Sequence, residues 1–456
     1  MDNFIPDSRI HELMERKPDP SRVREILQKS RRLERLTMEE TAELLAVNDP
    51  ELLQAIFEAA KSVKEDIYGS RLVLFAPLYI SNLCKNDCTY CAFRVSNKGV
   101  KRRALTMDEI RAEAEFLLKT GQKRALLVSG EAYPRDGLDY VLDAIATVYS
   151  ARDGKNTIRR LNVNIAPLEV EDFARLKEAE IGTYQIFQET YHEPTYHELH
   201  TFGPKADYLY RLSAIDRAFQ GGLDDVGVGI LFGLYDYRYE VLALMAHIEH
   251  LEKYFGMGPH TISVPRLEPA EGAPVAARPP YPVSDEDFKK IIAVLRLAVP
   301  YTGLILSTRE TPEIRAASFD LGVSQISAGS RTNPGGYSED GACEQFSLGD
   351  HRSLDEVVRD ICTHGYLPSF CTSCYRLGRT GLDFMEYAKP GAIKEKCLPN
   401  ALFTFEEYLI DYASEETKEI GRALMDRKLA DVPEAIRLAV NANLTKIRAG
   451  ERDLFM

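Results

Sequence analysis

From residue 71 onward the chain alternates between short apolar runs and longer charged stretches. The apolar runs are bounded by turn residues and have the length of buried strands, whereas the stretches between them show helical spacing. Eight strands are predicted, at residues 72–80, 124–130, 159–167, 183–190, 224–233, 260–267, 303–310 and 324–330. Repeated strand–helix units of this kind are typical of a parallel sheet.

Eight such units predict a (β/α)₈ barrel of the TIM type, with its chemistry at the carboxyl ends of the strands. The alternative is an open doubly wound sheet, which usually carries a Gly-rich phosphate turn after its first strand. Here that position holds cysteines. Periodicity alone also leaves open an ordinary α/β core whose loops are only structural.

The pattern divides the chain into three parts. Residues 1–70 carry apolar positions three and four apart and are expected to form a helical amino-terminal extension. Residues 71–340 are expected to form the barrel. Residues 341–456 lack a strand signal and are expected to form a helical carboxyl-terminal region. A length of 456 residues suits one barrel with extensions.

Composition and charge narrow the function classes. Hydrophobic residues make up 45% and charged residues 28%, as in an ordinary globular protein. The formal net charge of -13 argues against nucleic acid or an anionic membrane as partner, so we expect small molecules or proteins. The amino terminus lacks a secretory signal and no run is long enough for a membrane span, which predicts a cytoplasmic protein.

The grouping of the cysteines predicts two metal clusters. In a chain without a secretion signal, eight cysteines favour metal or redox chemistry over disulfides. Two of them, Cys343 and Cys362, stand alone. The other six form two triplets: Cys84, Cys88 and Cys91, and Cys371, Cys374 and Cys397.

The first triplet has the spacing CxxxCxxC and follows the first predicted strand. An iron–sulfur cubane normally takes four cysteines, so three leave one iron free for a chelating ligand such as the amino and carboxylate groups of S-adenosylmethionine (SAM). Tyr90 and Phe93 flank the last cysteines and offer aromatic cover for the cluster and adenine. A structural zinc site needs four ligands, and no nearby Cys or His supplies the fourth.

The loop NLCKNDCTYCAFRVSNK resembles the radical SAM superfamily, and more narrowly its tyrosine lyases that mature [FeFe]-hydrogenase. The resemblance extends over nearly the whole chain. It includes RRLNVNIAP, GTYQIFQETYHEPTY, DDVGVGILFGLYDYRYE, GPHTISVPRL, LSTRE and the carboxyl-terminal cysteines.

The second triplet is similar to the CxxC-x₂₂-C motif that holds an auxiliary cluster in these lyases. Related tyrosine lyases of thiamine biosynthesis lack it. From the residues alone it is another three-thiolate site with one open iron, and structural zinc or a buried cysteine group stays open. The resemblance implies that His260 holds an extra labile iron there, with L-cysteine or a similar ligand. Without the resemblance, a lone His near a strand would usually be interpreted as a core residue.

The resemblance also assigns SAM contacts. Gly130 and Glu131 match the GE motif that meets the methionyl amino group, and Glu189 and Arg211 match later SAM contacts. Each charged residue could instead be a salt-bridged residue at a strand end.

Arg309 follows a late strand and is therefore expected at the barrel mouth, where its guanidinium suits the carboxylate of an amino-acid substrate. Ser307 and Thr308, which directly precede Arg309, are expected to help bind the substrate. The Gly-rich segment 327–337 lacks a Walker lysine and does not predict a phosphate loop.

Three histidines, His192, His197 and His200, lie close together in sequence. Two of them are three residues apart, which suggests a metal site. We interpret them instead as a polar helical face, because such pairs often arise from spacing alone.

The resemblance implies a function. A [4Fe–4S] cluster with SAM on its open iron would start cleavage of the Cα–Cβ bond of L-tyrosine to p-cresol and dehydroglycine. Carbon monoxide and cyanide would then form at the auxiliary cluster for the H-cluster of [FeFe]-hydrogenase, with other maturation proteins as partners. Two alternatives remain: a tyrosine lyase of thiamine thiazole biosynthesis and a non-enzymatic iron–sulfur carrier or scaffold.

Overall fold

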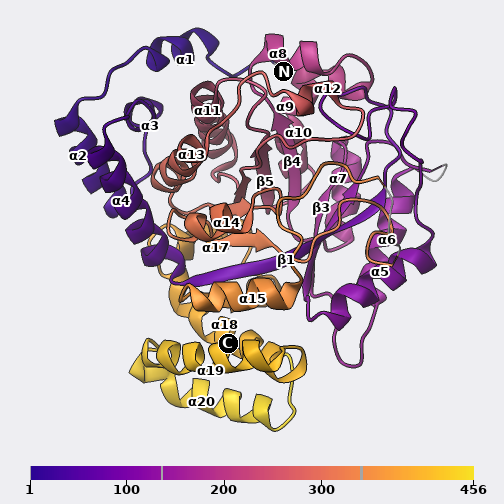
Figure 1. Ribbon diagram of the computed structural model, residues 1–456, viewed down its shortest axis with the longest axis vertical. Coiled ribbons are helices and arrows are strands. Elements are labelled where there is room, and N and C mark those ends of the chain that lie inside the picture. Colours follow the sequence, from indigo (N-terminus) through magenta and orange to yellow (C-terminus); the bar gives the residue numbers. More distant parts are fainter. Residues whose placement is uncertain (1, 135–136, 339–342) are drawn as a thin grey trace.

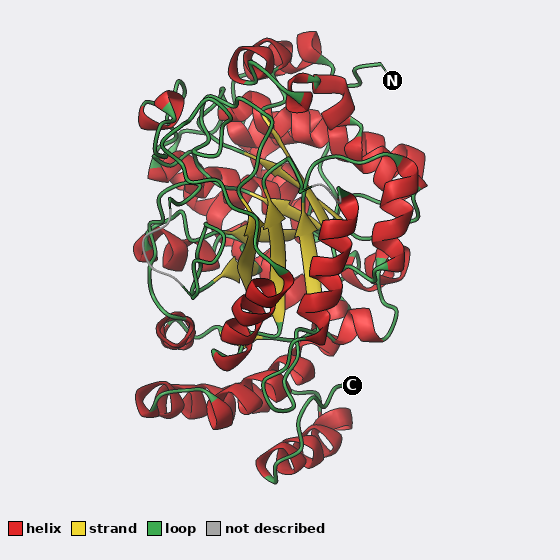
Figure 2. Cartoon of the chain, turned by 90° about the vertical axis from the view of Figure 1, so that its right-hand side faces the viewer, coloured by secondary structure: helices red, strands yellow, loops and turns green. Residues whose placement is uncertain are grey.

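The computed structural model describes residues 2–134, 137–338 and 343–456. Eight parallel strands form a closed barrel, because β1 pairs with both β2 and β8. The strands are β1 (Arg71–Ser81), β2 (Arg124–Ser129), β3 (Arg160–Asn164), β4 (Tyr184–Glu189), β5 (Val226–Ile230), β6 (Thr261–Ser263), β7 (Gly303–Leu306) and β8 (Gln325–Ser327). They lie inside a layer of helices (Figure 2). The predicted (β/α)₈ architecture is confirmed.

Each predicted apolar run contains one of these strands, but several runs extend beyond the paired residues. β6 shows why, since it ends at Ser263, two residues before Pro265. Proline has no N–H to give to a sheet, and the run continues as a buried loop. Apolar length therefore overestimates strand length at the barrel mouth.

A ninth strand, β9 (Leu367–Ser369), was not predicted from the sequence. It pairs with residues 71–73 of β1, ahead of Ala76, where pairing with β2 begins. Three residues with Pro368 in the middle show no strand periodicity, so the pattern could not predict this element. The region after residue 340 is therefore not entirely helical, and β9 brings the residues after it to the amino end of the barrel.

The remaining elements are helices (Figure 1). Before β1 lie α1 (Asp7–Met14), α2 (Pro20–Arg31), α3 (Met38–Leu45) and α4 (Pro50–Tyr68). Between the barrel strands lie α5 (Met107–Lys119), α6 (Leu138–Ser150), α7 (Val170–Glu178), α8 (Glu193–Leu199), η1 (Pro204–Ala206), α9 (Tyr208–Leu212), α10 (Ala214–Gln220), α11 (Tyr237–Phe255), α12 (Pro274–Ala277), α13 (Asp285–Ala298) and α14 (Pro312–Phe319). After β8 lie α15 (Leu354–Thr363), α16 (Ser373–Arg376), α17 (Gly381–Ala388), α18 (Ile393–Asp411), α19 (Glu415–Ala430) and α20 (Glu434–Arg448).

The expected boundary between residues 340 and 341 lies outside the described residues, so the three-part division stays a prediction. At the other boundary the chain turns sharply. Asp49 accepts a hydrogen bond from Leu52 N and starts α4, and Gly69 at φ 63° ends it two residues before β1. A positive φ of this size favours glycine.

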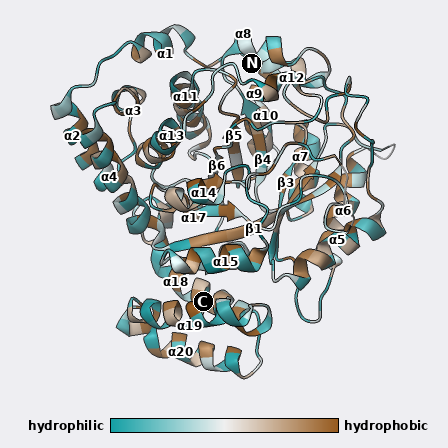
Figure 3. Cartoon of the chain, in the orientation of Figure 1, coloured by the Kyte–Doolittle hydropathy of each residue, from teal (hydrophilic) through white to brown (hydrophobic). Residues whose placement is uncertain are grey.

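The core lies between the barrel and its helices. Every residue of β1 except Arg71 is buried, and β1 is brown along most of its length in Figure 3. No helix in the described ranges is long and apolar enough to cross a membrane.

A buried ion pair joins the carboxyl-terminal helices to the barrel. Lys123, directly before β2, contacts Glu407 of α18, and both side chains are almost fully buried. Next to it, Tyr408 stacks on Phe370, with 5.0 Å between the ring centroids. Since α18 carries Cys397, these contacts position one of the second-triplet cysteines against the barrel.

Replacing Lys123 by Met should leave the carboxylate of Glu407 buried without its cation. Breaking one side of a buried pair costs about 3–5 kcal/mol, so the urea midpoint of unfolding should fall clearly. The control Lys119→Met changes an exposed residue of α5 and should keep the wild-type midpoint. Equal midpoints for the two variants would contradict the role of this pair.

Candidate functional site

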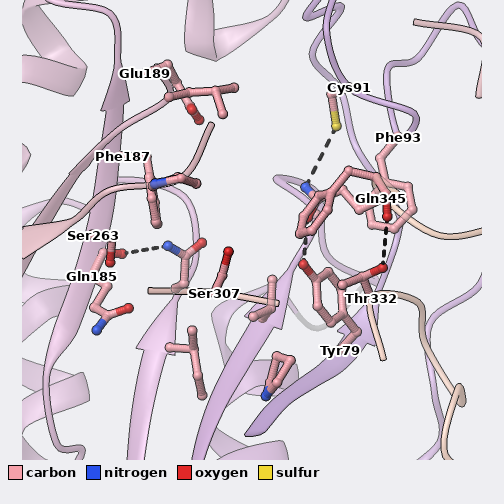
Figure 4. Close-up of a pocket in the computed structure, with 18 of the residues that line it drawn as sticks. Tyr79, Cys91, Phe93, Gln185, Phe187, Glu189, Ser263, Ser307, Thr332 and Gln345 are labelled. Carbon is pink, nitrogen blue, oxygen red and sulfur yellow. Dashed lines mark hydrogen bonds between the residues drawn. The ribbon is translucent and has the colours of Figure 1, made fainter. Parts of the chain in front are cut away.

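A cavity opens at the carboxyl ends of the strands. It is lined by Glu189, Ser263 and Ser327, the last residues of β4, β6 and β8, and by the three cysteines of the loop after β1. Figure 4 shows Cys91 on one side of this cavity and Glu189 on the other. The first cysteine triplet and the strand-end residues therefore share one site.

The cysteine loop is held by contacts from both sides. Asp87 N and Thr89 N donate to the carbonyl oxygens of Phe202 and Leu199. The guanidinium of Arg102 donates to carbonyl oxygens of the same loop, including that of Phe93 at 2.8 Å. The loop is thus fixed by backbone and arginine contacts, which leaves the cysteine sulfurs for the cavity.

Burial raises the pKa of the Cys91 thiol to about 11, and it raises the pKa of the Cys88 thiol still further. A buried thiolate needs a cation beside it. Cys88 is buried and Cys84 and Cys91 are half-buried, and three thiols that line one cavity suit a metal group that binds all of them as thiolates.

An ionic network lies beside the cysteines. Glu131 accepts hydrogen bonds from Arg211 at 2.9 Å and from Asn86 at 2.8 Å. Lys205 lies 2.6 Å from Glu189 and 3.9 Å from Glu131. Burial alone would raise the pKa of Glu131, but the charges of Arg211 and Lys205 hold it below its usual value. Both signs of charge are thus available to a zwitterionic ligand.

Backbone geometry also shapes this cavity. Glu189 adopts φ 71°, and the β4–β5 register shifts between Phe187 and Glu189. Such an irregularity at a strand end redirects a side chain. At Gly130 a Cβ atom would come within 2.3 Å of the Leu83 carbonyl oxygen, so only glycine fits beside the cysteine loop.

The two predicted aromatic residues, Tyr90 and Phe93, make different kinds of contact. The Tyr90 hydroxyl lies 2.8 Å from His200 Nε2, and His200 Nδ1 lies 2.7 Å from the Tyr196 carbonyl oxygen. Phe93 packs edge-on against Tyr79, with 6.3 Å between their centroids. Both predicted residues line the cavity.

The predicted substrate residues Ser307, Thr308 and Arg309 line the same cavity. The Arg309 guanidinium lies 3.3 Å from the centroid of Phe346 and donates to the Arg266 carbonyl oxygen at 3.4 Å. Within the described ranges it forms no ion pair. A half-buried guanidinium without an ion-pair partner there can receive a ligand carboxylate.

A second cavity lies at the opposite end of the barrel. It is lined by the second triplet, Cys371, Cys374 and Cys397, and by His260, which directly precedes β6. Arg71, Arg124 and Arg160, the first residues of β1, β2 and β3, complete the wall. The two cysteine triplets therefore occupy opposite mouths of the barrel.

Several arginine nitrogens of this second cavity are buried without a hydrogen-bond partner in the described structure. They are Nε and Nη1 of Arg71, Nε of Arg124 and Nη1 of Arg160. Unsatisfied buried donors are costly, above all on charged groups. The cavity therefore suits an anionic group, and a cluster carrying three thiolates has that charge.

His260 faces an acidic neighbour. Its Nδ1 lies 3.6 Å from Asp225 Oδ2, and the same carboxylate oxygen accepts from Tyr375 and Arg160. Burial lowers the pKa of His260 to about 4, so the imidazole is neutral at pH 7 and able to bind a metal. A carboxylate behind a histidine is a common arrangement around metals.

The three clustered histidines do not converge, and the prediction of a shared polar face is wrong for His200. His192 caps the start of α8, and His197 is exposed on that helix. The helix ends at Leu199, so His200 leaves it and is buried against Tyr90. The prediction from helical spacing is wrong here because α8 ends at Leu199, one residue before His200.

We call the cavity at the carboxyl ends of the strands the upper cavity and the cavity at their amino ends the lower cavity. The sequence analysis did not predict three residues that line the upper cavity, Asn86, Lys205 and Gln345. Gln345 accepts from the Tyr79 hydroxyl at 2.6 Å and donates to Cys91 Sγ at 3.7 Å (Figure 4). Asn86 carried a signal, since it lies between two predicted ligands. Gln345 carried none, because it lies 254 residues from Cys91 in the sequence.

Comparisons with known proteins agree with the fold. A family model for the Radical SAM superfamily matches residues 78–248, and one for the Biotin and Thiamin Synthesis associated domain matches residues 263–367. The 2-iminoacetate synthase of Salmonella typhimurium is 33% identical over 73% of this chain and 86% of its own length.

Two solved structures are similar over nearly the whole chain. A crystal structure of HydG, a maturase of the [FeFe]-hydrogenase, is 50% identical, with a TM-score of 0.97 and full coverage of both chains. The X-ray structure of the FeFe-hydrogenase maturase HydG from Carboxydothermus hydrogenoformans is 44% identical, with a TM-score of 0.84, and the match covers 96% of this chain and 97% of that one.

The buried imidazole of His200 should make the protein sensitive to acid. Burial, and then the charge of Lys205, hold its pKa well below 6.5, so the unfolded chain takes up a proton that the folded chain does not. Stability should therefore fall as the pH drops below about 6.5. The fall in urea midpoint between about pH 7.5 and 5.5 should be smaller in His200→Gln. In His197→Gln, which changes an exposed histidine, the fall in urea midpoint should match that of wild type. The same fall in all three proteins would refute this role of His200.

Proposed function

Because the chain belongs to the HydG family of the radical SAM superfamily, we propose that it cleaves the Cα–Cβ bond of L-tyrosine to p-cresol and dehydroglycine. Carbon monoxide and cyanide then form from dehydroglycine and serve assembly of the [FeFe]-hydrogenase H-cluster. The observation that carries the proposal is the pair of cysteine-lined cavities at opposite ends of one barrel.

The family implies a [4Fe–4S] cluster and SAM, and the upper cavity fits both. Its donor set is three thiols, one buried and two half-buried, and the paired charges of Glu131, Arg211 and Lys205 lie beside them. Cys84, Cys88 and Cys91 would hold the cluster. When bound, the cluster and SAM would supply radical chemistry able to start the reaction at the amino group of tyrosine.

The chain's own residues then position the reactants. Glu131 is ionised and suits the amino group of SAM, with Glu189 and Arg211 as further contacts and with Gly130 proposed to contact SAM where it packs against the cysteine loop. Tyr90 and Phe93 cover the site with aromatic surface. These contacts bind and orient the cofactor and exclude water from a reactive intermediate.

Arg309 is proposed to bind the tyrosine carboxylate, with Ser307 and Thr308 beside it. The guanidinium has no ion pair in the described parts of the chain, so a ligand carboxylate would supply one. Holding the amino acid by this end fixes the distance from its amino group to the cofactor.

In the lower cavity, Cys371, Cys374 and Cys397 are proposed to hold the auxiliary iron–sulfur cluster, and His260 an additional labile iron with L-cysteine or a similar ligand. The neutral imidazole with Asp225 behind it suits this role. The unsatisfied arginine donors suit the negative charge of the cluster and its ligands. Other maturation proteins are proposed to receive the product.

The test is an anaerobic assay of the reconstituted protein with SAM, a reductant and tyrosine, following p-cresol, carbon monoxide and cyanide. All three are expected. p-Cresol without carbon monoxide would favour the thiazole-type lyase, and absence of 5′-deoxyadenosine would favour a cluster carrier.

Changing Cys88 to Ala removes one of three sulfur ligands of the upper cavity. We expect 5′-deoxyadenosine formation to fall at least about 100-fold, because the cluster loses a ligand that the site cannot replace. The control Cys362→Ala changes a buried cysteine of α15 that lines neither cavity, and it should retain activity. Normal SAM cleavage by Cys88→Ala would refute the assignment.

Changing Cys371 or Cys374 to Ala should separate the two cavities. p-Cresol formation should stay within about twofold of wild type, whereas carbon monoxide should be lost, since only the lower site loses a ligand. Gas capture and chromatography of the same reaction measure both products. Undiminished carbon monoxide would exclude a role of the second triplet in its formation.

A further inference from the structure

The amino-terminal segment lies against the outer helices α8 and α11 (Figure 1). Asn3 donates to Glu193 at 2.9 Å, and the ring of Phe4 stacks on His250 with 3.9 Å between centroids. The Tyr239 hydroxyl donates to Asp7 at 2.7 Å. Contacts of several kinds therefore bring the start of α1 to the start of α8.

Three potential metal ligands meet at this junction. A carboxylate oxygen of Asp7 and one ring nitrogen each of His11 and His192 lie within 4.8 Å of one another. Asp7 and His11 are one helical turn apart on α1, with 3.6 Å between Oδ1 and Nε2. His192 comes from a distant part of the sequence, so the fold and not local spacing assembles the set.

We propose that Asp7, His11 and His192 form a site for one divalent transition-metal ion of the zinc class. Two imidazoles and one carboxylate suit Zn²⁺, Co²⁺, Ni²⁺ or Fe²⁺, with water in the fourth position. Ligands at about 2.0–2.1 Å from a tetrahedral ion lie about 3.4 Å apart. The ligand atoms, which lie within 4.8 Å of one another, would come to this separation by rotation of the exposed side chains of Asp7 and His11.

His192 is held in one orientation before any ion binds. Its ring stacks on Tyr235 at 3.7 Å between centroids, with an angle of 2° between the planes, and the edge of Tyr239 lies against it. Its Nδ1 lies 2.8 Å from Thr195 Oγ1. Thr195 N also donates to this Nδ1 at 3.4 Å as the cap of α8. With Nε2 on a metal, Nδ1 would carry the proton and donate to the Thr195 hydroxyl, and the longer contact from Thr195 N would be given up.

Tyr239 supports the other side of the site. Its hydroxyl donates to Asp7 Oδ1, and its ring lies 5.3 Å from that of His11. One α11 side chain thus contacts all three proposed ligands. Support of this kind reduces the ordering that metal binding would otherwise require.

The site joins the first helix of the chain to a segment beside the first cysteine loop. α8 directly follows the β4 region that carries Glu189, and its C-cap residue His200 contacts Tyr90. A bound ion would fasten α1 to this segment. The proposal concerns a separate site and does not depend on the reaction proposed above.

The test uses the reconstituted protein with its iron–sulfur clusters, titrated anaerobically with ZnCl₂ in a calorimeter. The variants are His11→Gln and His192→Asn, the latter because asparagine also caps a helix. The matched control is His197→Gln, an exposed histidine of the same helix outside the site. Thermal unfolding without zinc checks that all variants fold as wild type.

Wild type and His197→Gln should bind one more zinc equivalent than His11→Gln and His192→Asn. Crystals soaked in zinc should show an anomalous peak between the three side chains in the first two proteins only. The same stoichiometry in all four proteins, or a soaked wild-type crystal without that peak, would overturn the proposal.

Discussion

Parallel closure of the barrel is the constraint on which both cavities depend. In a closed parallel sheet all carboxyl ends meet at one mouth and all amino ends at the other. Residues that end strands, such as Glu189, therefore gather around the first triplet, and residues that begin strands, such as Arg71, gather around the second. One topological rule thus produces two chemically different sites in one chain.

The two mouths compensate charge in different ways. In the upper mouth, Glu131 and Glu189 face Arg211 and Lys205, so opposite charges are already paired. In the lower mouth, guanidinium nitrogens are buried without partners in the described structure. Since an unpaired buried donor is costly, the lower mouth has a stronger requirement for an anionic occupant.

The sequence predicted the features that depend on local pattern. Buried strands and their order follow from apolar runs, and the cysteine triplets follow from spacing. The lower arginines left a weaker signal, because Arg124 begins a predicted strand, Arg71 directly precedes one and Arg160 is the second residue of another, and a barrel brings such residues together. Contacts such as that between Gln345 and Cys91 could not be predicted, since they depend on how distant loops pack. β9 was missed because its pairing depends on β1 and not on its own residues.

The pairing of β9 with the start of β1 also bears on the order of assembly during synthesis. The ribosome completes residues 71–330, which contain all eight barrel strands, before it reaches β9 and Cys397. Domains form as their residues emerge, so the barrel can close while its amino-end arginines still face water. The last quarter of the chain then covers these arginines, so the lower cavity can form only after its three cysteines have been synthesised.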